Sequence, residues 1–154
     1  NLDDAAGTVA LIFLKHFKKY EEKFRVIEWT SIAGGGLDDP KTYGVIKVKI
    51  RDKVRVEGGE GVGPVHAMDV ALRKALERDY PELRYVKLID YKVILPEAER
   101  DTASIVRVFI KFTDGSRTWS TTATSSNIIE ASLNALIQGL DYYLQMESLK
   151  RTFI

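Results

Sequence analysis

The chain has 154 residues, 45% of them hydrophobic, which suits one compact domain or two small fused units with a core that needs no cross-links. It contains no cysteine, and this excludes disulfides, thiolate metal sites and a cysteine nucleophile. The formal net charge of +1 gives no overall attraction to nucleic acids or acidic membranes.

The sequence carries no targeting signal. Its longest apolar run, residues 9–14, is too short to span a bilayer, and no signal peptide precedes it. Together with the lack of cysteine, this favours a cytoplasmic protein without membrane contact. A start at Asn1 rather than methionine favours a piece of a longer polypeptide.

The first segment is expected to form a helix within residues 1–23, capped by Asp3 or Asp4. The side chains expected on its buried stripe, including a packed core histidine at His16, are Val9, Ile12, Phe13, His16, Phe17, Tyr20 and Phe24. Aromatic and β-branched residues predict a strand at 24–32, and glycine, aspartate and proline predict a loop at 33–40.

Alternation across residues 43–57, interrupted at 51–53, predicts a hairpin. Its apolar positions are Ile46, Val48 and Ile50, then Val54 and Val56 beyond the turn. A second helix is predicted from Pro64, ended by Tyr80 and Pro81, with the apolar stripe Val65, Met68, Leu72, Ala75 and Leu76.

The pattern then repeats. A strand is predicted at 86–95, a polar loop at 95–101, and a hairpin of strands 103–112 and 117–124 around the strong turn signal Asp114-Gly115. A long helix is predicted from Asn127. Gly63 aligns with Asn127 at an offset of 64 residues, and Ile27 aligns with Ile89 at an offset of 62.

The sequence therefore predicts an α+β fold of tandem β-β-β-α repeats, each a three-stranded antiparallel sheet with one helix, preceded by an N-terminal helix. The expected organisation is an N-terminal helix at 1–23, a first unit at 24–82 and a second unit at 83–150, together one domain. A three-stranded sheet with one helix buries one sheet face, so the remaining apolar area is expected to drive homodimerisation.

The glycine-rich junction at residues 56–64 is the main candidate site. Glycine allows positive φ and close approach, and amides at a helix start can hold a carboxylate. A weaker copy lies at Ser125, Ser126 and Asn127. An ammonium group is expected to pair with Glu60, Asp69 or Asp90, and the apolar wall would come from Val65, Met68, Ile128 and Ile129. These are the groups that a branched-chain amino acid requires.

Other patterns have plainer interpretations. His66 stands in the first turn of the second helix, and the two histidines form no metal or triad motif, so no catalytic residue and no metal site are expected. The alternating bases at Lys47, Lys49, Arg51, Lys53 and Arg55 are interpreted as a solvated hairpin face. The aromatic residues are interpreted chiefly as interface residues, namely Trp29, Trp119, Tyr142 and Tyr143.

The order helix, three strands and glycine-rich turn into a helix also fits a double-stranded-RNA-binding module. Such modules need lysines at the helix start, where this chain has residues 64–68 without a lysine or arginine. RNA binding is therefore the alternative rather than the main interpretation.

Three ordered segments carry a resemblance to a known family: residues 60–76, 88–93 and 127–132. They resemble the C-terminal regulatory domain shared by 2-isopropylmalate synthases and citramalate synthases. Residues 20–28 and 80–83 are more similar to the citramalate branch. The resemblance covers nearly the whole chain.

The resemblance implies an allosteric and dimerising domain that binds isoleucine or leucine as feedback inhibitor, without a cofactor. It implies that a separate catalytic barrel of the same polypeptide condenses acetyl-CoA with a 2-oxo acid, so that this part is not itself an enzyme. Nucleic acid and membrane are not expected partners. The effector-binding residues implied by motif and chemistry are Gly58, Gly59, Glu60, Gly61, Gly63, Pro64, Val65, Met68, Leu72, Asp90, Ser125, Ser126, Asn127 and Ile128.

The sequence departs from the family pattern at four positions. The second loop has Ser120 and Ala123 where the family usually has glycine, and Leu133 and Val62 replace a tryptophan and a polar residue. A dimerisation domain that has lost its ligand is therefore the other alternative.

Overall fold

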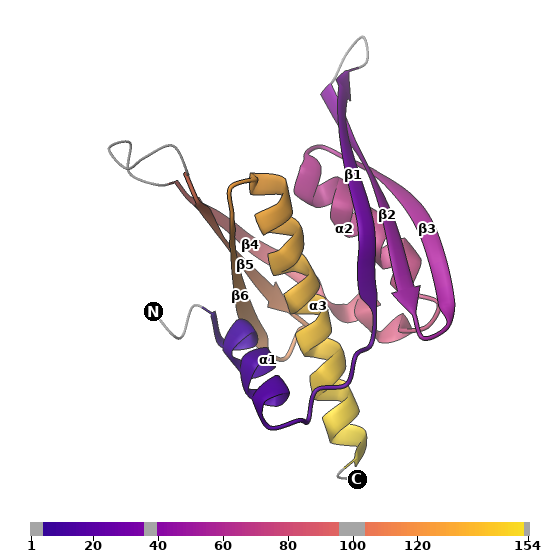
Figure 1. Ribbon diagram of the computed structural model, residues 1–154, viewed down its shortest axis with the longest axis vertical. Coiled ribbons are helices and arrows are strands. Elements are labelled where there is room, and N and C mark those ends of the chain that lie inside the picture. Colours follow the sequence, from indigo (N-terminus) through magenta and orange to yellow (C-terminus); the bar gives the residue numbers. More distant parts are fainter. Residues whose placement is uncertain (1–4, 36–39, 96–103, 153–154) are drawn as a thin grey trace. The chain divides into compact units, whose positions relative to one another are not determined.

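The computed structural model describes residues 5–35, 40–95 and 104–152. The chain folds into two compact units. Residues 22–84 form the first unit, and the described residues up to 21 join those from 85 onward in the second unit. Each unit contains one three-stranded antiparallel sheet and the helix that follows it, so the predicted tandem α+β fold is confirmed (Figure 1).

The first unit contains sheet A, made of β1 (Arg25–Gly35), β2 (Pro40–Ile50) and β3 (Lys53–Gly61), with β2 in the centre. Helix α2 (Pro64–Leu76) lies along one face of this sheet, and the 3-10 helix η2 (Pro81–Tyr85) follows it. The predicted alternation is confirmed on β2, where Ile46, Val48 and Ile50 are fully buried. The hairpin turns tightly at Arg51, which has a φ of 55°.

The second unit contains sheet B, made of β4 (Lys87–Ile94), β5 (Val106–Thr113) and β6 (Thr118–Ser125), with β5 in the centre. The 25-residue helix α3 (Ile128–Thr152) covers its inner face. The Asp-Gly turn is confirmed: the Asp114 amide bonds the Arg117 carbonyl at 3.2 Å, and Gly115 has a φ of 95°. The predicted polar loop at 95–101 falls mostly outside the described residues, as does the first residue of the strand predicted at 103–112, which begins at Val106.

The internal repeat extends to an irregularity in the strand pairing. In sheet A the register of β1 on β2 shifts between Val26 and Glu28. In sheet B the register of β4 on β5 shifts between Leu88 and Asp90. The bulged residues are therefore Ile27 and Ile89, which the sequence alignment already pairs, so the two sheets bend at equivalent points.

A cluster of aromatic residues lies in the core of the second unit. Trp119 stacks against Phe112 at 6.0 Å and Tyr143 at 5.6 Å between ring centroids, and its Nε1 donates to the Gly139 carbonyl at 3.0 Å. Trp119 and Tyr143 are only 4% and 6% exposed. Their interpretation as interface residues was wrong, because the long helix α3 covers this end of sheet B.

Helix α1 (Ala6–His16) belongs to the second unit and buries a face different from the predicted one. Its buried residues are Gly7 and Leu11, whereas Ile12, Phe13 and Phe17 are 62%, 57% and 63% exposed. His16 is also exposed, against the edge of the Phe17 ring, so the core-histidine prediction was wrong. The predicted caps Asp3 and Asp4 lie outside the described residues.

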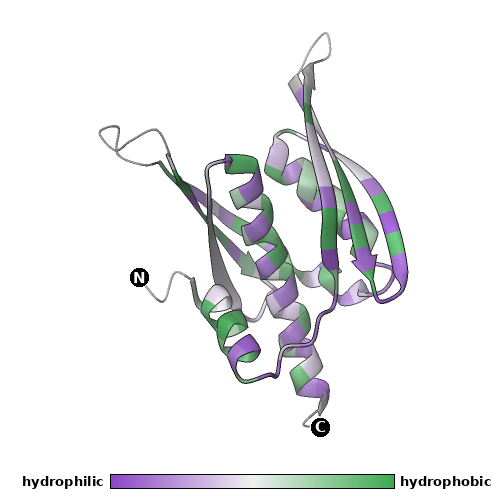
Figure 2. Ribbon diagram, in the orientation of Figure 1, coloured by the Kyte–Doolittle hydropathy of each residue, from purple (hydrophilic) through white to green (hydrophobic). Residues whose placement is uncertain are grey.

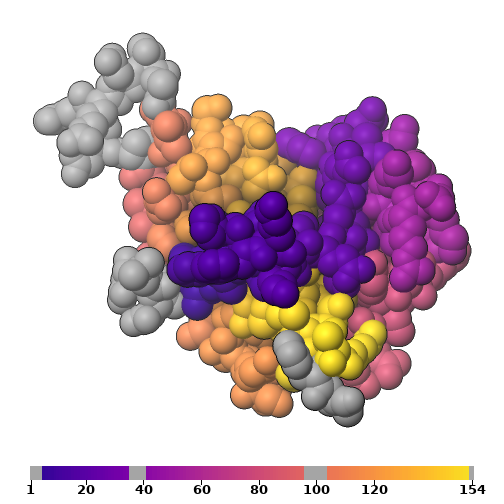
Figure 3. Space-filling model, turned by 60° about the horizontal axis from the view of Figure 1, so that its bottom comes forward, coloured from indigo at the N-terminus to yellow at the C-terminus, as the bar shows by residue number. Residues whose placement is uncertain are grey.

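Helix α1 buries this face because it covers the edge of sheet B. The Thr8 hydroxyl accepts a hydrogen bond from the amide of Thr122 in β6 at 2.9 Å, and donates one to Gln138 of α3 at 2.5 Å. A Cβ on Gly7 would lie 2.9 Å from the Ser120 carbonyl oxygen. Small and polar residues therefore face the strand, because an edge strand offers polar backbone groups. Figure 3 shows α1 in indigo beside the yellow C-terminal part of α3.

Candidate functional site: two strand-to-helix junctions and the outer face of sheet B

The glycines of the first junction belong to a strand rather than to a loop. Residues 58–61 continue β3, and only Val62 and Gly63 separate the strand from α2. A Cβ on Gly59 or on Gly61 would lie 2.5 Å from backbone atoms of Ala67 in α2. Among the described residues Gly115 is the one glycine with positive φ, so these glycines serve close packing and not a turn.

The start of α2 is formed by main-chain groups. Gly63 is the extended N-cap, with a φ of −159°, and Pro64 is the first helical residue. The Ala67 amide donates to the Gly63 carbonyl at 3.0 Å, and Nδ1 of the exposed His66 accepts from the Val62 amide at 3.3 Å. Val62 itself is 90% exposed. This junction therefore presents main-chain groups, the Val62 side chain and the imidazole of His66 at the surface.

Two of the three carboxylates predicted to receive an ammonium group, Glu60 and Asp69, are paired with bases of the first unit. Glu60 pairs with Lys41 at 2.9 Å, and its hydrogen bond and charge raise the pKa of the Lys41 ammonium. Asp69 pairs with Arg73 at 2.8 Å, and Arg73 also donates to the Leu83 carbonyl at 2.9 Å. Asp69 thus helps to fix α2 to η2, whereas the Glu60–Lys41 pair is half-exposed and open to exchange of partners.

Two predicted site residues lie deep beneath sheet A. Met68 is 1% exposed and Leu72 is fully buried. A Cβ on Gly44 of β2 would lie 3.0 Å from the Met68 sulfur, so the sheet backbone contacts this side chain directly. In this arrangement Met68 and Leu72 support the junction from below. Among the predicted residues of the first unit, Gly58 and Glu60 are exposed, and Gly63, Pro64 and Val65 are half-buried.

The second junction is closed by its own side chains. The Oδ1 atom of Asn127 accepts hydrogen bonds from the amides of Ile129 at 2.8 Å and Glu130 at 3.2 Å. The Ser125 hydroxyl accepts from the Asn127 amide at 3.1 Å and lies 3.0 Å from a Glu130 carboxylate oxygen, to which it donates. Asn127 is thus an N-cap that occupies the amides at the start of α3. Ser126 and Ile128 are exposed.

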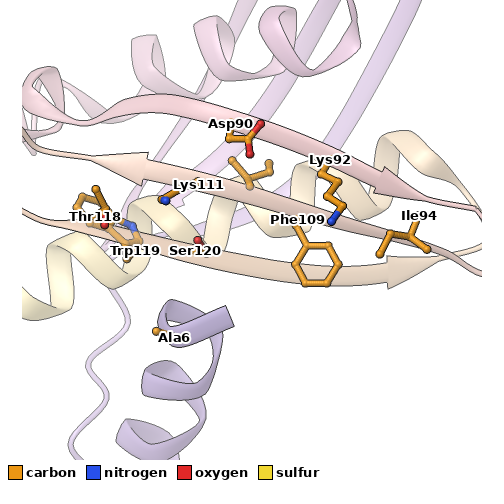
Figure 4. Close-up of a pocket in the computed structure, with 10 residues that line it drawn as sticks. Ala6, Asp90, Lys92, Ile94, Phe109, Lys111, Thr118, Trp119 and Ser120 are labelled. Carbon is orange, nitrogen blue, oxygen red and sulfur yellow. The ribbon is translucent and has the colours of Figure 1, made fainter. Parts of the chain in front are cut away.

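Asp90 lies apart from both junctions, on the outer face of sheet B, where it lines a hollow of about 450 Å³. Figure 4 shows that the hollow is lined by all three strands and by Ala6 at the start of α1. The register places Asp90 opposite Lys111 and Lys92 opposite Phe109. No local sequence pattern singles out Lys92, Phe109 or Lys111, because only the bulged register of β4 on β5 brings them beside Asp90.

The fourteen predicted effector residues therefore divide between the two units, nine in the first and five in the second. Within each unit they gather at a strand-to-helix junction, except Asp90. Among the described residues, no three histidines or carboxylates gather where they could hold a metal ion. No helix in the described ranges is long and apolar enough to cross a membrane.

Comparison with known proteins gives a consistent result. Over 149 residues the chain is 44% identical to the (R)-citramalate synthase of Sulfolobus acidocaldarius, covering 97% of this chain and 27% of that protein. The (R)-citramalate synthase of Geobacter sulfurreducens is 38% identical, with coverages of 92% and 27%. That of Aquifex aeolicus is 34% identical, with coverages of 96% and 28%. The chain thus spans little more than a quarter of each relative's length.

A family match covers most of the fold, from α1 into the last part of α3. Residues 5–144 match the family described as the LeuA allosteric (dimerisation) domain. This range includes both three-stranded sheets, both strand-to-helix junctions and the outer face of sheet B. The chain therefore belongs to the LeuA allosteric (dimerisation) domain family.

Proposed function

We propose that this chain is the regulatory and dimerisation part of a citramalate synthase. The observation that carries the proposal is the family match over residues 5–144, together with curated (R)-citramalate synthases that are 34–44% identical over nearly the whole chain. In this proposal the acyl transfer from acetyl-CoA belongs to the part of the polypeptide outside this chain. The two units together act as one domain, as a homodimer.

The proposed effector is a branched-chain amino acid, isoleucine or leucine, that binds at the strand-to-helix junctions. The open start of α2 supports this, because Gly63 and Pro64 leave main-chain groups at the surface without a side-chain cap. Each junction has an exposed apolar side chain that suits an aliphatic tail, Val62 in the first unit and Ile128 in the second. Glu60, half-exposed beside Lys41, is the carboxylate proposed to receive the ammonium group.

Inhibition then follows from the thermodynamic linkage between effector binding and the arrangement of the regulatory dimer. An effector that binds one arrangement of the regulatory dimer more tightly than another shifts the population toward that arrangement. The coupling is reciprocal, so ligands of the catalytic part shift the affinity for the effector by the same factor.

A thermal-shift panel tests effector binding. Isoleucine, leucine and valine are added to the 154-residue chain, with the 2-oxo acid of isoleucine as a control that keeps the tail and lacks the ammonium group. Ligand at 100 times its dissociation constant adds about 2.7 kcal/mol. That corresponds to a rise in Tm of roughly 5–10 °C for a chain of this size.

Two variants test where on the chain the effector binds. Val62→Asp should abolish the shift, because a charge replaces an apolar side chain that is 90% exposed at the junction. Ile12→Asp, at a position 62% exposed on α1, should leave it intact. A flat response to all three amino acids at millimolar concentration would exclude effector binding and leave the alternative of a dimerisation domain without a ligand.

A further inference from the structure

The hollow of about 450 Å³ on the outer face of sheet B has two lysines among its lining residues, and we call it the basic hollow. Lys92 of β4 lies directly opposite Phe109 of β5, and Lys111 follows Phe109 by two residues on the same face. Diagonal neighbours of this kind lie about 7–8 Å apart, within reach of long side chains. The two ammonium groups can therefore meet on one ligand beside the Phe109 ring (Figure 4).

The protein itself leaves both lysines without a partner. In the part of the chain that the structure describes, Lys92 and Lys111 are exposed, and no ion pair or hydrogen bond engages their ammonium groups. Asp90 lies opposite Lys111 in the register, but its Oδ1 atom accepts the Tyr91 amide at 2.9 Å rather than an ammonium group. The hollow thus holds two unpaired cations and one carboxylate whose second oxygen is available.

The internal repeat separates the charges that both sheets share from those that sheet B adds. Sheet A has the same cross-strand pair of acid and lysine directly after its bulge, with Glu28 opposite Lys47. The second lysine does not recur, because Lys92 corresponds to Thr30 at the offset of 62 residues. The extra cation is therefore a property of sheet B and not of the repeated fold.

The hydroxyl groups of β6 are also specific to sheet B. Thr118 and Ser120 line the hollow, and at the offset of 64 residues they correspond to Val54 and Val56 of β3. Figure 2 shows the alternation along β3 as bands of green and purple. Ala6 at the start of α1 adds a wall from outside the sheet. A three-stranded sheet of this type forms without these polar groups, so their presence points to a ligand.

The groups in the hollow define the chemistry of that ligand. Two ammonium groups suit two carboxylates, and such charge-assisted hydrogen bonds are roughly twice as strong as neutral ones. The available oxygen of Asp90 only accepts hydrogen bonds, so it favours a ligand that carries a hydroxyl donor. The half-buried Phe109 ring offers an apolar surface for a short carbon chain. The volume lies within the usual range of small-molecule sites.

We propose that the basic hollow binds a small hydroxy-dicarboxylate anion, with its carboxylates on Lys92 and Lys111. Its hydroxyl group donates to Asp90, and its carbon chain lies on Phe109. The inference goes beyond the proposed function, because the hollow shares only Asp90 with the residues assigned to the branched-chain effector. One identification rests on the proposed function: citramalate, the product of a citramalate synthase, is a hydroxy-dicarboxylate, and the hollow is then a product site.

Isothermal titration of the 154-residue chain tests the inference with a matched pair of ligands. Malate and succinate share one dicarboxylate skeleton and differ by a single hydroxyl group. Malate should bind at one site per chain, with a Kd about tenfold lower than that of succinate, which is the change expected for one hydrogen bond to a charged group. Citramalate should behave like malate.

Variants of the chain locate the binding. Lys92→Gln and Lys111→Gln should each raise the Kd for malate by about tenfold or more. The matched control is Lys47→Gln, at the position of sheet A equivalent to Lys111, and it should leave the Kd unchanged. Asp90→Ala should bring the Kd values of malate and succinate within about twofold of each other, because the acceptor for the hydroxyl group is lost. Circular dichroism checks that each variant is folded.

The possible outcomes are distinct. Malate that does not bind at millimolar concentration, or that binds equally to both lysine variants, would overturn the inference. Inorganic phosphate that binds as tightly as malate would overturn the proposed class of ligand and show a nonselective anion surface. The thermal shift with isoleucine is measured on Lys92→Gln in parallel. A shift without malate binding would overturn only this inference, and malate binding without a shift in the wild type would overturn only the branched-chain effector.

Discussion

Gly139 of α3 and Phe112 of β5 are in contact so close that a Cβ on Gly139 would lie 2.0 Å from Cε2 of the phenyl ring. Phe112 is fully buried and stacks on Trp119, whose Nε1 bonds the Gly139 carbonyl. This single glycine sets how closely the long helix approaches sheet B.

The variant Gly139→Ala should lower the free energy of unfolding by about 2 kcal/mol, because overpacking a filled core costs about 1–3 kcal/mol. Alanine's higher helix propensity, about 1 kcal/mol, offsets part of this cost. Urea denaturation measures the change. Gly34→Ala is the control, since its Cβ would meet only the Lys41 carbonyl oxygen at 3.9 Å. An equal decrease in the free energy of unfolding in both variants would refute the packing explanation.

Alanine substitutions at two neighbouring glycines near the end of β3 should differ sharply in their effect on the free energy of unfolding. A Cβ on Gly59 would lie 2.5 Å from the Ala67 carbonyl oxygen and 2.7 Å from the Ala71 amide nitrogen, which are backbone atoms of α2. A Cβ on Gly58 would meet only the Gly44 carbonyl oxygen, at 3.7 Å. Gly59→Ala should therefore destabilise the chain by about 3 kcal/mol.

Gly58→Ala should change the free energy of unfolding by less than about 0.5 kcal/mol, as surface substitutions do. Chemical denaturation of the two variants under the same conditions gives the comparison. If Gly58→Ala were the more destabilising change, the close approach of α2 would not explain the glycine run.

Gln145 ties the segment after α1 to α3. Its Nε2 donates to the Glu21 carbonyl at 2.5 Å and to Asp141 Oδ1 at 3.0 Å, and its Oε1 accepts from the Glu21 amide at 3.2 Å. Gln145 is 2% exposed, so Gln145→Met leaves buried polar groups without these bonds. The expected loss is about 3 kcal/mol, since each unsatisfied buried group costs about 1–3 kcal/mol.

Hydrogen exchange provides the local readout for this variant. The Glu21 amide should lose protection in Gln145→Met while amides of β5 keep theirs. Glu147→Gln is the control on the same helix, because its ion pairs with Arg117 and Lys150 are partly exposed and contribute about 0–1 kcal/mol. Unchanged protection at Glu21 would contradict the role assigned to Gln145.

Asp114 should make stability depend on pH in the acid range. Its carboxylate accepts the amides of Arg117 at 2.8 Å and Ser116 at 2.9 Å, and the Arg117 amide is the main reason that the pKa of Asp114 lies below its ordinary value of 3.8. A lowered folded-state pKa adds stability above the unfolded-state value, and this stability is lost as pH falls through the folded-state pKa.

The measurement compares wild type with Asp114→Asn, which keeps an acceptor oxygen without the charge. The wild type should be the more stable at pH 6, and the difference in the free energy of unfolding should shrink once the pH falls below about 3.8. A difference that stays constant from pH 6 to pH 2 would show that ionisation of Asp114 does not contribute.

The repeat and most elements could be predicted because their signals are local. Alternation identified β2, the Asp-Gly pair located the turn of the second hairpin, and the alignment of Ile27 with Ile89 identified equivalent points of the two repeats. The bulges at these points are visible only in the strand register. The motif segments also led to the correct family. Each of these signals is either a pattern within a few neighbouring residues or a similarity between the two halves of the chain.

The sequence determined which elements form and that they form twice, because period and turn chemistry are properties of neighbouring residues. Tertiary structure decided which faces are covered. In β3 the register directs Arg55 to the helix side, where it pairs with Asp79 at 3.1 Å, and leaves Val54 and Val56 exposed. In α1 the packing against sheet B buries Gly7, while Phe13 stays exposed. A side chain is buried only where another element packs against it, and that element is formed by residues distant in the sequence.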